Sequence, residues 1–155
     1  MIREDMQGDD GRSPDKELRQ ALGEWIEGRA WDHYATLTTA KPVTRSRLFT
    51  MFRNRFVRKL EQLAQRRIDW LLVVEGDSAR KHIHLHALLY STARLRVPDI
   101  QHRWGLGRSR VEIYRPFGGA APYMAKDLPE NPWAWDFSRR LPPLRRNALG
   151  QSEAQ

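Results

Sequence analysis

The feature that most constrains this chain is the stretch KHIHLHALLY at residues 81–90, in which three histidines occupy alternate positions. Side chains two residues apart point to the same face of a β-strand, so a strand here places His82, His84 and His86 on one face. The residues between them are apolar and would face a core. Same-face side chains lie roughly 6.5–7 Å apart, a spacing at which two imidazoles can converge on one metal ion. The stretch therefore predicts a strand with metal-binding chemistry on one face.

The apolar run WLLVVE, which ends at Glu75, predicts a second strand just upstream. With residues 76–81 as the loop of a hairpin, Glu75 would lie opposite His82, and Val73 opposite His84. Loop length and turn type decide this register. Glu75 then shares the histidine face, where its carboxylate would supply an oxygen ligand.

Composition favours a polyanionic partner. The 155 residues carry a formal net charge of +8, which indicates nucleic acid before a membrane. The absence of cysteine excludes disulfides, thiolate zinc sites and cysteine nucleophiles. No apolar run approaches the ~20 residues that span a bilayer, and the first residues do not resemble a signal peptide. We therefore expect a cytoplasmic protein without membrane contact.

The order of the expected elements indicates an α+β fold. Strands are expected within 31–39, over 70–75 and 82–90, and at 110–114; helices are expected at 15–28, 45–67, 97–104 and from 120 onward. The central six elements follow the β-α-β-β-α-β order of ferredoxin-like (RRM-like) folds. We expect an antiparallel sheet with helices packed on one face, in which the first and third strands are central neighbours.

Three parts of the chain can be distinguished. Residues 1–30 form a charged N-terminal segment with a short helix, 31–128 form the functional domain, and 129–155 form a loosely ordered basic tail with several prolines. Aromatic residues of the tail, Trp133 among them, are expected to tuck part of it back onto the domain.

The expected helix 45–67 has one apolar face and one strongly basic face. The basic face contains a single acid, Glu61, so phosphate contact is at least as strong an interpretation as simple solvation. We expect DNA contacts from this helix and from two residues near the histidine strand: Arg53, Arg55, Arg58, Thr38 and Lys81.

A second group of reactive residues is Tyr123 and Lys126, which share a face if this segment is helical. A phenol with a pKa of about 10 is a poor nucleophile at neutral pH, and a nearby cation lowers the cost of its phenolate. Beside a metal site that polarises a phosphate, the pair predicts phosphoryl transfer through a phosphotyrosine. Tyr114 is a rival nucleophile, while Tyr34 and Tyr90 are expected to be packing residues.

Three short motifs resemble those of HUH endonucleases. His84-Leu85-His86 is similar to the family's His-hydrophobe-His motif, and Tyr123-Met124-Ala125-Lys126 to its Tyr-x-x-Lys motif. Thr36-Leu37-Thr38 resembles the first motif of replication initiators. The three follow the order found in rolling-circle replication (Rep) proteins, over residues 31–128. The third histidine departs from the pattern; the 84–86 frame fits the following apolar run better, with His82 as an extra ligand.

The resemblance implies an enzyme that nicks and rejoins single-stranded DNA through a 5′-phosphotyrosine. Tyr123 would be the nucleophile and Lys126 would position the phosphate. Mg²⁺ or Mn²⁺ would be held by His84, His86 and Glu75, with His82. The implied partners are single-stranded DNA, including a hairpin at a replication origin, and a host helicase and polymerase acting in trans. The protein would act as a monomer or weak dimer.

Other functions remain open at this stage. A single-tyrosine HUH transposase shares the motif order, whereas relaxases usually reverse it. A non-enzymatic nucleic-acid-binding module would stack bases on sheet aromatics, but here the exposed sheet face carries histidines and threonines. A metal-binding domain without chemistry would have no use for Tyr123.

Overall fold

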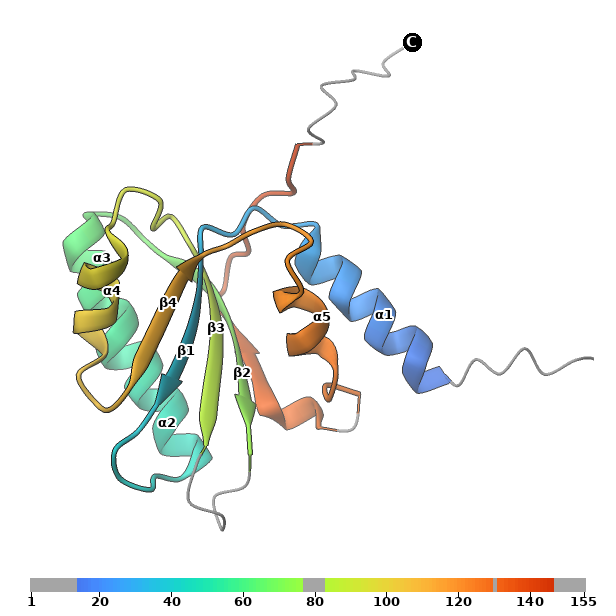
Figure 1. Ribbon diagram of the computed structural model, residues 1–155, viewed down its shortest axis with the longest axis horizontal. Coiled ribbons are helices and arrows are strands. Elements are labelled where there is room, and N and C mark those ends of the chain that lie inside the picture. The colour runs from blue at the N-terminus through green and yellow to red at the C-terminus, as the bar shows by residue number, and fades with distance from the viewer. Residues whose placement is uncertain (1–13, 77–82, 130, 147–155) are drawn as a thin grey trace, which may run out of the picture.

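The computed structural model describes residues 14–76, 83–129 and 131–146, and they contain one five-stranded antiparallel sheet (Figure 1). Its strand order is β4-β1-β3-β2-β5. The strands are β1 (His33–Thr38), β2 (Asp69–Glu75), β3 (His84–Tyr90), β4 (Ser109–Ile113) and β5 (Trp135–Phe137). The predicted α+β class is confirmed, and so is the central pairing of the first and third strands.

Helices lie on both faces of the sheet, so the expectation of helices on one face is wrong (Figure 1). One face is covered by α2 (Arg45–Met51), a π-helical segment (Phe52–Val57), α3 (Arg58–Ala64) and α4 (Val97–Trp104). The other is covered by α1 (Pro14–Glu27) and α5 (Ala120–Ala125), which pack against each other. The physical reason is that the central strands β2 and β3 are apolar on both faces, and both faces must be shielded from water.

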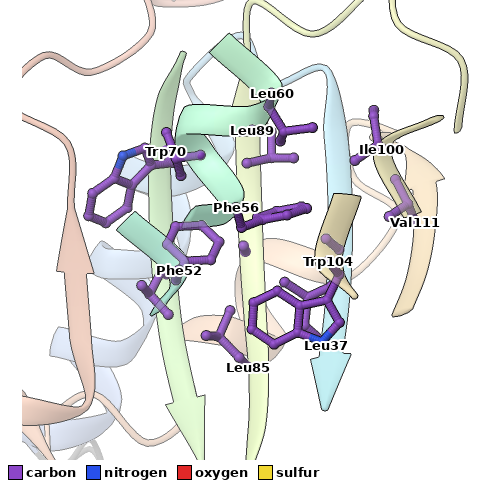
Figure 2. Close-up of a cluster of buried hydrophobic side chains, with 14 of the residues drawn as sticks. Leu37, Phe52, Phe56, Leu60, Trp70, Leu85, Leu89, Ile100, Trp104 and Val111 are labelled. Carbon is purple, nitrogen blue, oxygen red and sulfur yellow. The ribbon is translucent and has the colours of Figure 1, made fainter. Parts of the chain in front are cut away.

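The larger core lies under the long helix formed by α2, the π-helical segment and α3. Figure 2 shows Phe52 and Phe56 pointing from this helix onto the sheet. The ring of Phe52 meets Trp70 edge-on at 5.3 Å, and the ring of Phe56 meets Trp104 at 5.6 Å. The expected helix 45–67 is thus real, although its middle is π-helical and it ends at Gln65, which has a left-handed backbone.

The C-terminal region is more ordered than a loose tail. A 3₁₀ turn (Pro132–Ala134) leads into β5, which pairs with β2 so that Trp135 lies opposite Val73. The Trp135 ring also packs edge-on against Trp25 of α1 at 6.3 Å. The prediction that tail aromatics return to the domain is confirmed for Trp135, and the prediction of loose order is wrong for this segment.

The hairpin register differs from the expected one by two residues. Glu75 pairs with His84, and Val73 pairs with His86, because the connection is longer than residues 76–81. An even shift leaves every side chain on its original face. Glu75 therefore still shares a face with His84 and His86.

None of the helices in the described residues is long and apolar enough to cross a membrane.

Candidate active site

His86 is the buried centre of the histidine face. It lies on β3 between Thr36 of β1 and Val73 of β2. Its Nδ1 is 3.0 Å from the hydroxyl of Tyr34 and 3.4 Å from that of Thr36, and its Nε2 is 2.9 Å from Glu75 Oε2. Burial lowers the pKa of His86, an effect that the hydrogen bond and charge of Glu75 oppose. The imidazole is therefore neutral at pH 7, with Nε2–H donating to Glu75 and the Tyr34 hydroxyl donating to Nδ1.

Glu75 joins the histidine face to helix α5. The hydroxyl of Tyr123 donates to Glu75 Oε2 at 2.8 Å, and Lys126 Nζ donates to Oε1 at 2.9 Å. Burial alone would raise the pKa of Glu75, but hydrogen bonds from Lys126, Tyr123 and His86 outweigh it and lower the pKa to about 2. The same contact with Glu75 raises the pKa of Lys126. At neutral pH the site thus contains a firm carboxylate and a firm ammonium group.

Helix α5 presents Tyr123 and Lys126 toward the sheet because its other side is buried. Gly119, with a φ of +99°, precedes the helix and turns the chain into it. Met124, on the buried side, belongs to the apolar cluster that α1 and α5 share. The Lys126 ammonium lies 3.9 Å from the centre of the Tyr123 ring, and this ring meets His86 edge-on at 5.2 Å. Two motifs that are far apart in the sequence thus meet at one point.

His84 lies at the exposed start of β3, one strand repeat from His86. The two rings are nearly parallel, with centres 6.5 Å apart. Glu75 lies directly opposite His84 on β2. Two imidazoles and a carboxylate suit a divalent ion such as Mn²⁺. Within the described residues, however, no three His, Asp or Glu side chains already converge on such an ion; Glu75 would have to turn from its present partners. The fourth predicted ligand, His82, lies outside the described residues.

Two hollows flank this cluster and meet at it. One, of about 410 Å³, is lined by Glu75 and Lys126 among others. The other, of about 690 Å³, is lined by Tyr34, Thr36 and Arg110 among others. Tyr123 and His86 line both. Tyr123, whose exposed fraction is 42%, therefore stands between two solvent-open depressions, where an extended substrate can reach its hydroxyl.

The predicted DNA-binding residues are not part of this cluster. The carbonyl of Thr38 at the end of β1 accepts a 2.8 Å hydrogen bond from the Trp104 indole. Arg53 forms an ion pair with Asp136 at 3.0 Å, while Arg55 and Arg58 are exposed on the helix. Lys81 lies outside the described residues.

The other tyrosines differ from Tyr123 in their surroundings. Tyr114 is buried, its hydroxyl donates to Glu27, and burial followed by the influence of this carboxylate strongly raises its pKa. Such a phenol is a poor nucleophile. Tyr34, expected to be a packing residue, instead contacts His86. The available signal was its position two residues from Thr36, on a strand expected beside the histidine strand.

Residues 32–130 match the model of a family of replication-associated proteins, those of the ORF2 type. The chain belongs to this family. The match runs from the start of β1 past the end of α5 and includes every residue of the cluster around Glu75. The expectation of a replication initiator is thereby confirmed for this replication-associated protein at the level of the family. Comparisons with curated proteins and with solved structures gave no match.

Proposed function

We propose that this replication-associated protein nicks and rejoins single-stranded DNA through a 5′-phosphotyrosine on Tyr123, and so initiates rolling-circle replication. One observation carries the proposal: the Tyr123 hydroxyl is held 2.8 Å from Glu75, in a network with Lys126 and His86 that opens on two hollows. A solvent-accessible phenol beside a lysine, a carboxylate and a neutral imidazole has the parts needed for nucleophilic attack on a phosphodiester.

In the proposed reaction the Tyr123 oxygen attacks the phosphorus of one phosphodiester. The new bond joins this oxygen to phosphorus, and the bond from phosphorus to the 3′ oxygen breaks. The phenolic proton is lost and the departing 3′ oxygen gains one, so the products are a 5′-phosphotyrosine and a free 3′-OH. Attack by a DNA 3′-OH on the phosphotyrosine reverses these steps, which rejoins the strand and frees the single nucleophile.

Lys126 supplies positive charge where the reaction develops negative charge. Its ammonium lies 3.9 Å from the centre of the Tyr123 ring, close enough to stabilise a phenolate. Its raised pKa keeps it protonated throughout the physiological range. A phosphate entering the hollow gives the ammonium a second anionic partner beside Glu75.

His84, His86 and Glu75 would hold Mg²⁺ or Mn²⁺, which supplies polarisation of the scissile phosphate when bound. The neutral state of His86 suits this role, because an imidazole must be unprotonated to bind a metal. With Nε2 committed to an ion, Nδ1 would carry the proton, and the hydroxyls of Tyr34 and Thr36 lie within reach to accept it.

The released 3′-OH would prime synthesis by a polymerase acting in trans, and a helicase in trans would unwind the duplex. A single-stranded origin or the loop of an origin hairpin would supply the substrate, since a base-paired strand does not fit an open hollow on a sheet face as readily.

The proposal is tested by incubating the protein with a pool of end-labelled single-stranded oligonucleotides and Mn²⁺, followed by a denaturing gel. A labelled band at protein mass is expected, and EDTA or Tyr123→Phe should abolish it. Tyr90→Phe is the matched control and should leave it intact, because Tyr90 packs in the second apolar cluster. Tight DNA binding without any adduct, from protein shown to bind Mn²⁺, would instead indicate a binding module.

A further inference from the structure

Trp133 is an exposed indole at the edge of the active-site hollow. It lies in the 3₁₀ turn just before β5, and 60% of its surface is exposed. It lines the 410 Å³ hollow that contains Tyr123 and also a neighbouring hollow of about 480 Å³ beside α2. An indole left in water forgoes the burial that usually stabilises this residue, so its position points to a ligand.

The backbone around Trp133 is firmly held although the side chain is exposed. The turn is closed by a 3.0 Å hydrogen bond from the amide of Ala134 to the carbonyl of Asn131. Two residues further on, Trp135 pairs with Val73 of β2. Since Val73 is also the neighbour of His86, strand pairing fixes the distance between Trp133 and the active site. The indole is thus presented in a constant place relative to Tyr123.

Arg45 is the second residue shared by these two hollows. It begins α2, and its guanidinium reaches the carbonyl of Gly76 at 3.5 Å, a marginal contact. Its buried Nε has no hydrogen-bond partner within the described residues. A guanidinium with unused donors is well suited to bind a phosphate.

The charge of this region is compatible with a nucleic-acid strand. The two carboxylates nearest this path are each bonded to a cation, Glu75 to Lys126 and Asp136 to Arg53. The active-site hollow and its neighbour therefore form one path with cations along it and an aromatic face at its middle. Grooves that bind single strands combine these two features.

We propose that Trp133 and Arg45 form a nucleotide subsite of the DNA strand next to the scissile phosphate. The indole of Trp133 stacks on one base, and Arg45 binds the phosphate of that nucleotide. The subsite deepens the proposed function and rests on it, because it takes the strand that Tyr123 attacks. Stacking accepts any base, so this subsite holds the strand in place without reading its sequence.

The test measures binding of a fluorescent oligothymidylate of about 16 nucleotides, the upper end of single-strand site sizes, by anisotropy in a Tyr123→Phe background. Trp133→Leu, which keeps an apolar side chain, should weaken binding about tenfold, and Trp133→Phe should retain most of it. An oligomer of abasic sugar-phosphates should bind wild-type and Trp133→Leu proteins equally. Phe117→Ala removes an exposed aromatic outside both hollows and should change nothing.

Arg45→Ala should weaken binding of both the thymidylate and the abasic oligomer, and should lower the slope of log affinity against log salt by about 1. Arg94→Ala, an exposed arginine outside both hollows, is its charge control. Equal affinity of the Trp133→Leu and wild-type proteins for oligothymidylate would overturn the subsite, even if the covalent adduct forms. The expected losses without any adduct would leave the subsite standing and remove the nicking reaction.

Discussion

The hydroxyl of Tyr123 and the carboxylate of Glu75 are joined by a 2.8 Å hydrogen bond that links α5 to the end of β2. The same carboxylate also binds Lys126 and His86. The nucleophile, the cation and the imidazole therefore share one anionic partner. A change in the charge of Glu75 affects all three groups at once.

Replacing Glu75 by glutamine should destabilise the fold at neutral pH and much less in acid. The folded-state pKa of Glu75 is about 2, against an ordinary value of 4.5. A depressed pKa contributes stability that is fully present above pH 4.5 and is lost as pH falls toward 2. After discounting for partial exposure, we expect Glu75→Gln to lower the free energy of unfolding by about 1–2 kcal/mol at pH 7.

Urea denaturation of both proteins between about pH 7 and pH 2.5 measures this difference. Glu112→Gln, which removes an exposed carboxylate paired with Arg110, is the control and should show little change at any pH. A difference for Glu75→Gln that stays constant into acid would show that the carboxylate charge is not its source.

Removing either central histidine should weaken metal binding. His84→Ala and His86→Ala each delete one of the two proposed nitrogen ligands, and we expect the affinity for Mn²⁺ to fall at least about tenfold, as measured by calorimetry without DNA. His102→Ala is the control, because His102 is exposed on α4, which covers the opposite face of the sheet. Equal Mn²⁺ affinities for all three variants and the wild type would exclude the proposed ligands.

Arginines of the long helix should contribute to DNA affinity through charge. Simultaneous replacement of Arg53, Arg55 and Arg58 by alanine should weaken single-strand binding and flatten its salt dependence, if they contact phosphates. Arg53 already binds Asp136, so its single replacement should have the smallest effect. Anisotropy titrations at several salt concentrations measure the slope, and an unchanged slope for the triple variant would assign these residues to a solvated surface.

The larger core should depend strongly on Phe56. This side chain is fully buried and meets the Trp104 ring edge-on. Phe56→Ala should lower the free energy of unfolding by about 3–5 kcal/mol. Phe49→Ala, on the same helix but only partly buried, should cost less than half as much. Equal losses in a denaturant titration would contradict the packing described for this helix.

Local patterns in the sequence predicted most of the framework. Alternating histidines indicated the strand β3, and regularly spaced apolar residues indicated the helix over Phe52 and Phe56. The burial of both sheet faces was missed, although Leu71 and Leu72 are adjacent, apolar and fully buried on opposite sides. A continuous apolar run of this kind was the available signal, because a strand with one wet face alternates.

Long-range features were harder to predict. The register of β2 against β3 depends on the length of their connection, which apolar patterning does not report. The strand β5 is only three residues long and lies in a proline-containing segment, so its pairing with β2 left little trace in the sequence. The meeting of Glu75 with Lys126 follows from how α5 packs on α1, a contact between distant segments.

The most direct test of the central claim is to locate the covalent bond. The adduct formed with a single-stranded oligonucleotide and Mn²⁺ is digested with protease and nuclease, and its peptides are sequenced by mass spectrometry. The account predicts a nucleotide remnant linked through phosphate to Tyr123. A remnant on Tyr34, which also lies beside His86, or on any other residue would contradict it.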